Sequence, residues 1–188
     1  MQGGEVSDDT ALLEAAKAFD QEALKTIFET YSSAIYRYAL RLCRDSIEAD
    51  NVVGDVFAQL IDQLADGKGP RTNLRSYLYQ IAYHIIVDHS RDKAHQSSME
   101  VAEFMASGET FVATQAEDNA LYDALAKAIN HDLTDDQRHV VILHFVEGLS
   151  MQETADVIGK SVNNIKVIQN RAFGKLRQVL NRVVEENR

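Results

Sequence analysis

The chain has little of several residue types on which common structures depend. A single cysteine, Cys43, among 188 residues excludes an internal disulfide and a multi-thiolate zinc site, and its place in a helical pattern suggests packing. One proline and no alternating apolar-polar run of useful length exclude a substantial sheet. No apolar run approaches the roughly 20 residues that span a bilayer, and the amino terminus lacks the blocks of a signal peptide. We therefore expect an all-α protein of the cytoplasm, without membrane insertion.

Patterns typical of catalytic, metal or cofactor sites are also missing. His84 and His89, and likewise His139 and His144, are five residues apart, whereas a zinc-binding helix aligns two histidines four residues apart. No glycine-rich phosphate loop follows a strand, because no strand is expected. The aspartates and glutamates fall at positions expected on the solvent-exposed faces of helices, and no pattern predicts two of them together in a pocket. The sequence therefore predicts no catalytic residue, no metal and no cofactor.

Charge is distributed unevenly along the chain. The net charge of −10 at pH 7 argues against a protein that coats DNA, because duplex binding depends largely on cations that displace counterions from phosphates. Residues 160–188 nevertheless carry seven basic and two acidic side chains, whereas residues 1–30 carry two basic and seven acidic ones. This asymmetry favours a carboxyl-terminal part that holds DNA and an amino-terminal part that meets a protein partner. A solvated surface that serves solubility is the alternative for the first ten residues.

Helical periodicity in the first half predicts a bundle, the domain of residues 20–94, after an acidic segment with a first helix at residues 1–19. In each helix apolar residues recur at steps of three and four and so form one buried stripe. The expected helices are residues 20–44, whose stripe includes Phe28, a second helix from Asp45 or Ser46 to the break at 67–70, and a third helix capped by Thr72 that runs to about Asp92. Such a bundle can stand as a domain.

The periodic pattern fails from residue 95 to 116 and then resumes. Serines, threonines and glycine interrupt the few apolar residues, so this segment is expected to be a flexible linker. The second domain, residues 117–188, is expected to contain four helices, one of which begins with a capping box at Thr134. The predicted fold class is all-α, with two helical domains joined by that linker.

Residues 150–172 have the pattern of a helix-turn-helix. Ser150 and Glu153 fit a capping box, and Gly159 permits the sharp turn between the two helices. The outward side chains of the second helix are amides, cations and a valine, which are the groups that meet base edges, phosphates and thymine methyls in the major groove. The candidate DNA-binding residues are Ser161, Asn163, Asn164, Lys166, Val167, Asn170 and Arg171. An ordinary helical hairpin with a solvated polar face is the alternative.

With these motifs the chain resembles the extracytoplasmic-function (ECF) sigma factors of bacterial RNA polymerase, compact sigma factors that keep two helical domains. The segments from Leu133-Thr134-Asp135-Asp136-Gln137-Arg138 to Glu153-Thr154-Ala155 are similar to the family's fourth conserved region. Residues 49–57 resemble the helix that grips the coiled coil of the polymerase's largest subunit, and residues 73–83 resemble the segment that melts promoter DNA. The resemblance implies a region 2-like bundle at 20–94 and a region 4-like domain at 117–188.

The resemblance also implies residues for two further surfaces. Core polymerase binding falls on a carboxylate pair beside an apolar ridge, which would supply orientation and an anchor: Asp50, Val52, Asp55, Val56 and Phe57. Binding of the melted promoter element falls on flat side chains that stack on unpaired bases and on cations that hold phosphates: Arg75, Tyr77, Tyr79, Tyr83, His84 and Arg91. Burial in the domain core is the alternative for Phe57 and for Tyr77.

Two departures from the family pattern bear on specificity. Relatives usually have Arg-Asn where this chain has Tyr83-His84, and Ser-Arg-Leu where it has Val167-Ile168-Gln169, so the bases read at both promoter elements are expected to differ. The resemblance implies core RNA polymerase, promoter DNA and an anti-sigma factor as partners, and no enzymatic activity. A stand-alone helix-turn-helix transcriptional regulator, with an amino-terminal sensor or dimerisation bundle, is the alternative; it would not bind core polymerase.

Overall fold

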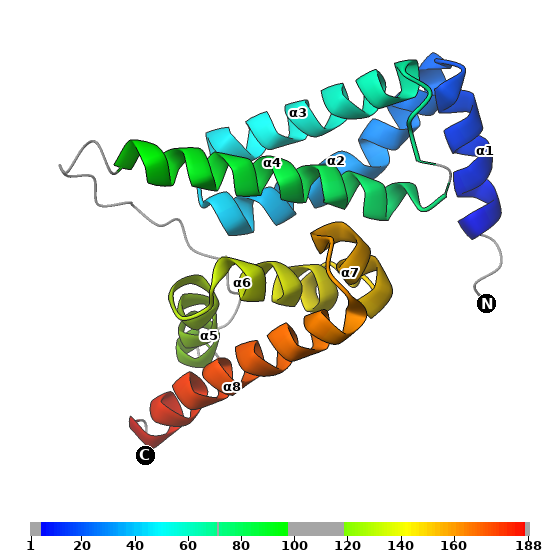
Figure 1. Ribbon diagram of the computed structural model, residues 1–188. Helices are drawn as coiled ribbons and strands as arrows, with labels where there is room; N and C mark the ends of the chain where they lie inside the picture. Colours follow the sequence, from blue (N-terminus) through cyan, green and yellow to red (C-terminus); the bar gives the residue numbers. More distant parts are fainter. Residues whose placement is uncertain (1–4, 71, 98–118, 187–188) are drawn as a thin grey trace. The chain divides into compact units, whose positions relative to one another are not determined.

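Figure 1 shows the computed structural model of the protein, which describes residues 5–70, 72–97 and 119–186. The regular structure of these residues is entirely helical, which confirms the predicted fold class. The helices of residues 5–97 form one compact unit, and most of residues 119–186 form a second. Most of the expected linker, residues 98–116, lies outside the described residues. No described helix is both long and apolar enough to cross a membrane.

Four helices make the first unit: α1 (Glu5–Lys17), α2 (Gln21–Cys43), α3 (Ser46–Ala65) and α4 (Leu74–Ser97). Aspartates cap two of them. Asp20 Oδ1 accepts the backbone N–H of Ala23 at 2.9 Å, and Asp45 Oδ1 accepts that of Glu48 at 3.0 Å. Each cap satisfies a backbone donor that the first helical turn leaves without a partner. The predicted starts of α2 and α3 are therefore confirmed.

Both predicted ends of α4 were wrong. Asn73, and not Thr72, caps this helix, because Asn73 Oδ1 accepts the backbone N–H of Ser76 at 3.1 Å. At the other end α4 continues to Ser97, well beyond Asp92. Residues 93–97 contain neither glycine nor proline, so nothing in the local sequence ends the helix when its apolar stripe stops. The helix therefore extends into the first residues of the expected linker, residues 95–97.

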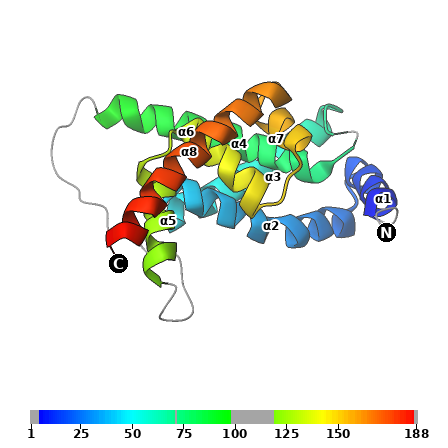
Figure 2. The same ribbon diagram turned by 90° about the horizontal axis from the view of Figure 1, so that it is seen from below.

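The helices α2, α3 and α4 contact one another and enclose the core of the first unit (Figure 2). Side chains that are less than 2% exposed come from all three helices: Ile27, Ile35, Tyr38, Val52, Val56, Leu60, Leu74, Leu78 and Tyr79. Phe28 is an exception to the predicted stripe of α2, because its side chain is 47% exposed. Consecutive residues point about 100° apart around a helix, and on α2 it is Ile27 that faces the core.

The second unit contains α5 (Asn119–His131), α6 (Asp135–Val141), most of α7 (Met151–Ile158) and α8 (Val162–Glu186). A five-residue π-helical stretch, η1 (Ile142–Val146), continues α6 and was not predicted. The predicted capping box is present, with Thr134 Oγ1 accepting the N–H of Gln137 at 3.4 Å and Gln137 Oε1 accepting that of Thr134 at 3.1 Å. The helices α5, α6 and α8 meet in an apolar cluster of Ala128, Leu133, Val141, Ala172 and Leu176.

Candidate nucleic-acid interface

The helices α7 and α8 and the turn between them have the local geometry of a helix-turn-helix (Figure 1). Ser150 Oγ accepts the N–H of Glu153 at 3.1 Å, and Glu153 Oε2 accepts the N–H of Ser150 at 2.7 Å. Gly159 ends α7 with φ 71° and ψ 33°, a left-handed conformation that favours glycine. Ser161 Oγ accepts the N–H of Asn164 at 3.3 Å and so caps α8. The Ser161 oxygen is therefore used within the fold, which leaves its hydroxyl hydrogen for a partner.

Burial separates two faces of α8. Ile165 and Ala172 are fully buried on the inner face. The outer face carries every other predicted DNA-binding residue, and all of these are exposed: Asn163, Asn164, Lys166, Val167, Asn170 and Arg171. Val167 lies between Asn163 and Asn170, about one helical turn from each. Because this valine is 46% exposed, it presents an apolar contact between two amides.

The cations near α8 fall into two groups. Lys160 Nζ lies 2.5 Å from Asp136 Oδ2, and Lys175 Nζ donates to the backbone oxygen of Asp132 at 2.9 Å, so both hold the second unit together. Lys166, Arg171 and Arg177 are exposed, and the structure gives them no ion pair with any described residue. Cations without an internal partner remain available for phosphates. The basic charge that the sequence shows in this segment is therefore only partly free to bind DNA.

Two residues predicted to meet the melted promoter element are used inside the first unit. Tyr79 is 1% exposed, and its ring meets that of Tyr38 edge-on at 5.3 Å between centroids. The guanidinium of Arg75 lies 5.8 Å from the centre of the Tyr79 ring, a cation–π distance. The prediction that Tyr79 stacks on a base was therefore wrong, because its ring belongs to the core. Arg75 is half-buried, and its guanidinium packs on this ring.

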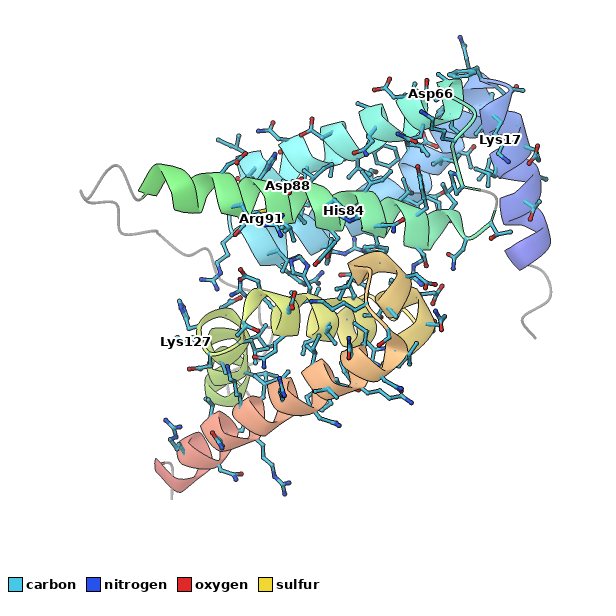
Figure 3. The ribbon with its side chains drawn as sticks, in the orientation of Figure 1. Lys17, Asp66, His84, Asp88, Arg91 and Lys127 are labelled. Carbon is cyan, nitrogen blue, oxygen red and sulfur yellow. The ribbon has the colours of Figure 1, made fainter. Side chains whose placement is uncertain are left out.

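The remaining members of this candidate set also lie on α4, and they differ in exposure. His84 and Arg91 are exposed along the helix, and Arg91 forms a 3.5 Å ion pair with Asp88 (Figure 3). Both partners of that pair are more than two-thirds exposed, so the pair is weak and leaves Arg91 available. Tyr77 is half-buried, and this burial raises the pKa of its hydroxyl. Tyr83 is only 9% exposed, with its ring 5.4 Å from that of His84, so its ring belongs to the core and the prediction that it stacks on a base was wrong.

The apolar ridge predicted for α3 belongs mainly to the core. Val52 and Val56 are fully buried and Phe57 is 9% exposed, so these three side chains do not form the predicted surface anchor. The reason is the helical period, which turns residues 52 and 56 to the same inner face of α3. Asp50 and Asp55 are exposed, as predicted. The burial of Phe57 agrees with the alternative that the sequence left open.

An open groove of about 410 Å³ between α2 and α3 provides an exposed apolar surface, whereas the predicted ridge of α3 is buried. It is lined by Phe28, Ser32, Ser33, Tyr36 and Arg37 of α2 and by Asp50 and Val53 of α3. The Phe28 ring rests on the Phe57 ring, with 4.8 Å between centroids, so Phe57 supports the groove from beneath. An apolar floor with a cation and a carboxylate at its rim is suited to a protein partner rather than to nucleic acid.

Sequence reasoning missed the α2 side of this groove. Phe28 was assigned to the buried stripe, and Tyr36 and Arg37 drew no attention because they lie outside the motifs. A partial signal was present, since Phe28 directly follows Ile27 and the two side chains point about 100° apart around the helix. A second large apolar residue beside a helix stripe is therefore worth treating as a candidate surface contact.

Family comparisons cover both units. Residues 27–96 match the family model described as Sigma-70 region 2, and residues 131–178 match the one described as Sigma-70, region 4. The first match contains the groove and the outward side of α4, and the second contains α7 and the outer face of α8.

The chain is also similar to individual proteins. It is 27% identical over 173 residues to the ECF RNA polymerase sigma factor BldN of Streptomyces coelicolor, with 90% of this chain and 64% of BldN covered. It is 23% identical over 176 residues to the ECF RNA polymerase sigma factor SigX of Bacillus subtilis, with 88% of each covered. The chain thus spans somewhat less than two thirds of BldN and most of SigX.

A solved structure has a similar fold. The sigma factor RpoE from Bartonella quintana, in complex with the anti-sigma factor NepR, has a TM-score of 0.66 and 22% sequence identity. The match covers 84% of this chain and 96% of that one. At this identity the likeness is one of fold.

Proposed function

We propose that the two helical domains of this chain bind different partners. The chain belongs to the extracytoplasmic-function sigma factors of bacterial RNA polymerase. Sigma factors direct transcription initiation and are not enzymes, because the polymerase performs the catalysis. In our proposal the domain of residues 20–94 binds core RNA polymerase and the melted promoter element, and the domain of residues 117–188 binds the upstream element as duplex. The observation that carries this proposal is the exposed outer face of α8, with amides at its centre and unpaired cations beside them.

The groove between α2 and α3 is the proposed contact with core polymerase. Phe28 provides an apolar anchor, and Arg37 and Asp50 at the rim provide charges of both signs that orient the partner. Asp55 is exposed on the same helix, about 140° around it from Asp50, and does not line the groove. The buried residues Val52, Val56 and Phe57 hold α3 in place and act indirectly.

The outward side of α4 is the proposed contact with the melted promoter element. His84 offers an exposed ring with a hydrogen-bond donor and an acceptor, which can stack on an unpaired base or read its edge. Tyr77, half-buried and seven residues earlier, lies on the same helix face, and Arg91 supplies a cation for the backbone, while the buried Tyr83 ring packs beside His84. Because relatives usually have asparagine at the His84 position, we assign this chain's preference at the melted element to that residue.

The outer face of α8 is the proposed contact with the upstream element. Asn163 and Asn170 can accept and donate hydrogen bonds at base edges, and Val167 between them can contact a thymine methyl. Lys166 and Arg171 hold phosphates on the two sides of the groove, which positions the helix without selecting a sequence. We therefore expect specificity to depend on the amides and affinity on the cations.

We further infer that an anti-sigma factor binds this chain. The RpoE structure of similar fold contains the anti-sigma factor NepR, and the groove and the outer face of α8 are both open surfaces that such a partner could cover. A protein that acts with core polymerase on promoter DNA works where the chromosome is, so we assign it to the cytoplasm.

Run-off transcription with purified core polymerase tests the function directly. The chain is added to core enzyme with a library of genomic fragments, and transcripts that depend on the chain identify its promoters. On such a promoter, Lys166→Ala should weaken initiation at all sequences, and Asn163→Ala or Asn170→Ala should change which upstream sequences are preferred. Lys127→Ala is a matched control, because Lys127 is an exposed lysine on another helix, α5, of the same unit (Figure 3).

Two results would reject the proposal. A chain that does not associate with core enzyme but protects duplex DNA alone would be a stand-alone regulator. A chain that supports initiation equally well with all three α8 substitutions would read its promoters through another surface.

A further inference from the structure

The helix α8 contains a glycine, Gly174, where the folded chain does not need one. A Cβ added at this position meets no heavy atom within 4 Å apart from its chain neighbours and the adjacent backbone of its own helix. The residue lies in the interior of a regular α-helix, in a conformation that alanine adopts more favourably than glycine. Internal packing therefore does not explain the glycine, and a close approach from outside the chain is the other common reason for one.

Gly174 lies on the outer face of α8, one turn beyond the proposed base-reading residues. It follows Asn170 by four residues and Val167 by seven, and residues at these spacings share a helix face. Ala172 and Leu176, two residues away on either side, are buried on the opposite face. Bare helix backbone is therefore exposed in line with the side chains that would enter the major groove.

Two arginines flank this stretch of bare backbone. Arg171 precedes Gly174 by three residues and Arg177 follows it by three, so they lie on its two sides, about one turn away. Both are exposed, and neither forms an ion pair with a described residue. The nearby Lys175 differs, because its ammonium group donates to the Asp132 carbonyl at 2.9 Å. Of the described cations within one turn of the glycine, the two arginines are thus left to face an anion.

We propose that Arg171, Gly174 and Arg177 form a binding site for a backbone phosphate of the upstream promoter duplex. The site rests on the proposed function of α8 and extends its DNA contact by one turn. A guanidinium binds phosphate oxygens through two parallel N–H donors, so two of them can hold one phosphate from both sides. The missing Cβ lets that phosphate approach the helix closely enough for both arginines to reach it. The contact adds affinity without reading a base.

The test measures promoter binding by the complete holoenzyme as a function of salt. The DNA is a fragment selected from a genomic library by the unaltered holoenzyme. Each phosphate contact contributes about 0.9 to the slope of log affinity against log salt. When the salt concentration is raised from 50 to 200 mM, the promoter affinity of every holoenzyme should fall. The fall should be roughly 3.5-fold smaller for Arg177→Gln than for the unaltered chain. Gly174→Ala and Gly174→Leu should weaken binding in that order, because the added side chain displaces the phosphate.

Thermal unfolding of the same variants separates this role from a structural one. Gly174→Ala should raise the Tm of the free chain by a few degrees, because alanine is the better helix residue and its Cβ has room. A variant that is more stable yet binds DNA less tightly is not explained by damage to the fold. Arg182→Gln is the control for charge, since Arg182 is an exposed arginine farther along α8, and it should keep the full salt slope.

Each other outcome overturns the site. Arg177→Gln could leave the salt slope unchanged while Lys166→Ala still reduces it. That result would mean that α8 binds DNA as proposed but that Arg177 does not contact a phosphate. Equal slopes for Arg177→Gln and Arg182→Gln would mean that the charge acts diffusely. Full affinity for Gly174→Leu would show that no phosphate approaches there. If the unaltered holoenzyme selected no fragment, the proposed function itself would fail, and the site with it.

Discussion

Alanine substitutions of Val56 and Phe28 separate the supporting residues of α3 from the surface proposed to meet core polymerase. Val56 is fully buried, so Val56→Ala removes two packed methyl groups and leaves a cavity. At about 0.8 kcal/mol for each buried carbon plus a cavity contribution, the free energy of unfolding of the first unit should fall by about 2–3 kcal/mol. The affinity of the folded chain for core polymerase should stay within about twofold, because Val56 touches no partner.

Phe28→Ala should give the opposite result. Its ring is 47% exposed in the groove, so truncation should cost only about 1 kcal/mol of stability. An aromatic anchor in the middle of an interface is worth more, and its loss should weaken core binding at least about tenfold, which is about 1.4 kcal/mol. Phe19→Ala is the matched control, because Phe19 is 44% exposed and does not line the groove.

Two measurements are needed for each variant. Urea unfolding followed by far-ultraviolet circular dichroism gives the stability change from the transition midpoint at constant slope. Titration of an amino-terminally labelled chain with purified core enzyme gives the affinity. If Val56→Ala weakened core binding without changing the urea midpoint, the buried face of α3 would have to be the contact. If Phe28→Ala bound core as tightly as Phe19→Ala, the groove would not belong to the interface.

Three further predictions test the pH response, the melting surface and a helix cap. Burial lowers the pKa of His139 from 6.5 to about 4. The unfolded chain therefore binds a proton at this imidazole more tightly than the folded chain does. The free energy of unfolding should be highest above pH 6.5 and should fall by up to about 3 kcal/mol as the pH approaches 4. Urea midpoints at several pH values should show this loss in the unaltered chain and not in His139→Gln. Tyr79→Ala should destabilise the first unit by about 3–4 kcal/mol, whereas His84→Ala should leave stability within about 0.5 kcal/mol and reduce permanganate reactivity of unpaired thymines at the start site. Asn73→Ala should cost about 1 kcal/mol in urea unfolding, and Thr72→Ala should cost little.

Local chemistry accounts for the parts of the fold that the sequence predicts well. Asp20, Asp45, Thr134 and Ser150 were expected to begin helices, and each accepts a hydrogen bond from the first turn of its helix. Such caps involve residues three apart in sequence, so no knowledge of the tertiary structure is needed. The cap of α4 was misplaced because Thr72 and Asn73 are adjacent and both suit the position, and the hydrogen bond from the Ser76 N–H to Asn73 Oδ1 identifies the cap.

The candidate site was predicted unevenly for a related reason. On α8 the inner and outer faces follow from one amphipathic period, so every predicted DNA-binding residue after Ser161 is exposed. On α3 and α4 the buried face is wider than the motif suggested and takes in Val52, Val56 and Tyr79. A pattern along one helix does not show how many other helices lie against it.

The sequence by itself determined that the chain is helical, where most of its helices begin, and that the segment around residues 150–172 has the pattern of a DNA-binding helix pair. These features depend on contacts within a few residues of one another. Only the tertiary structure decided which aromatic and apolar side chains remain on the surface. Burial depends on residues distant in sequence, as when Tyr38 of α2 takes the Tyr79 ring into the core and the Phe57 ring of α3 supports Phe28 at the groove.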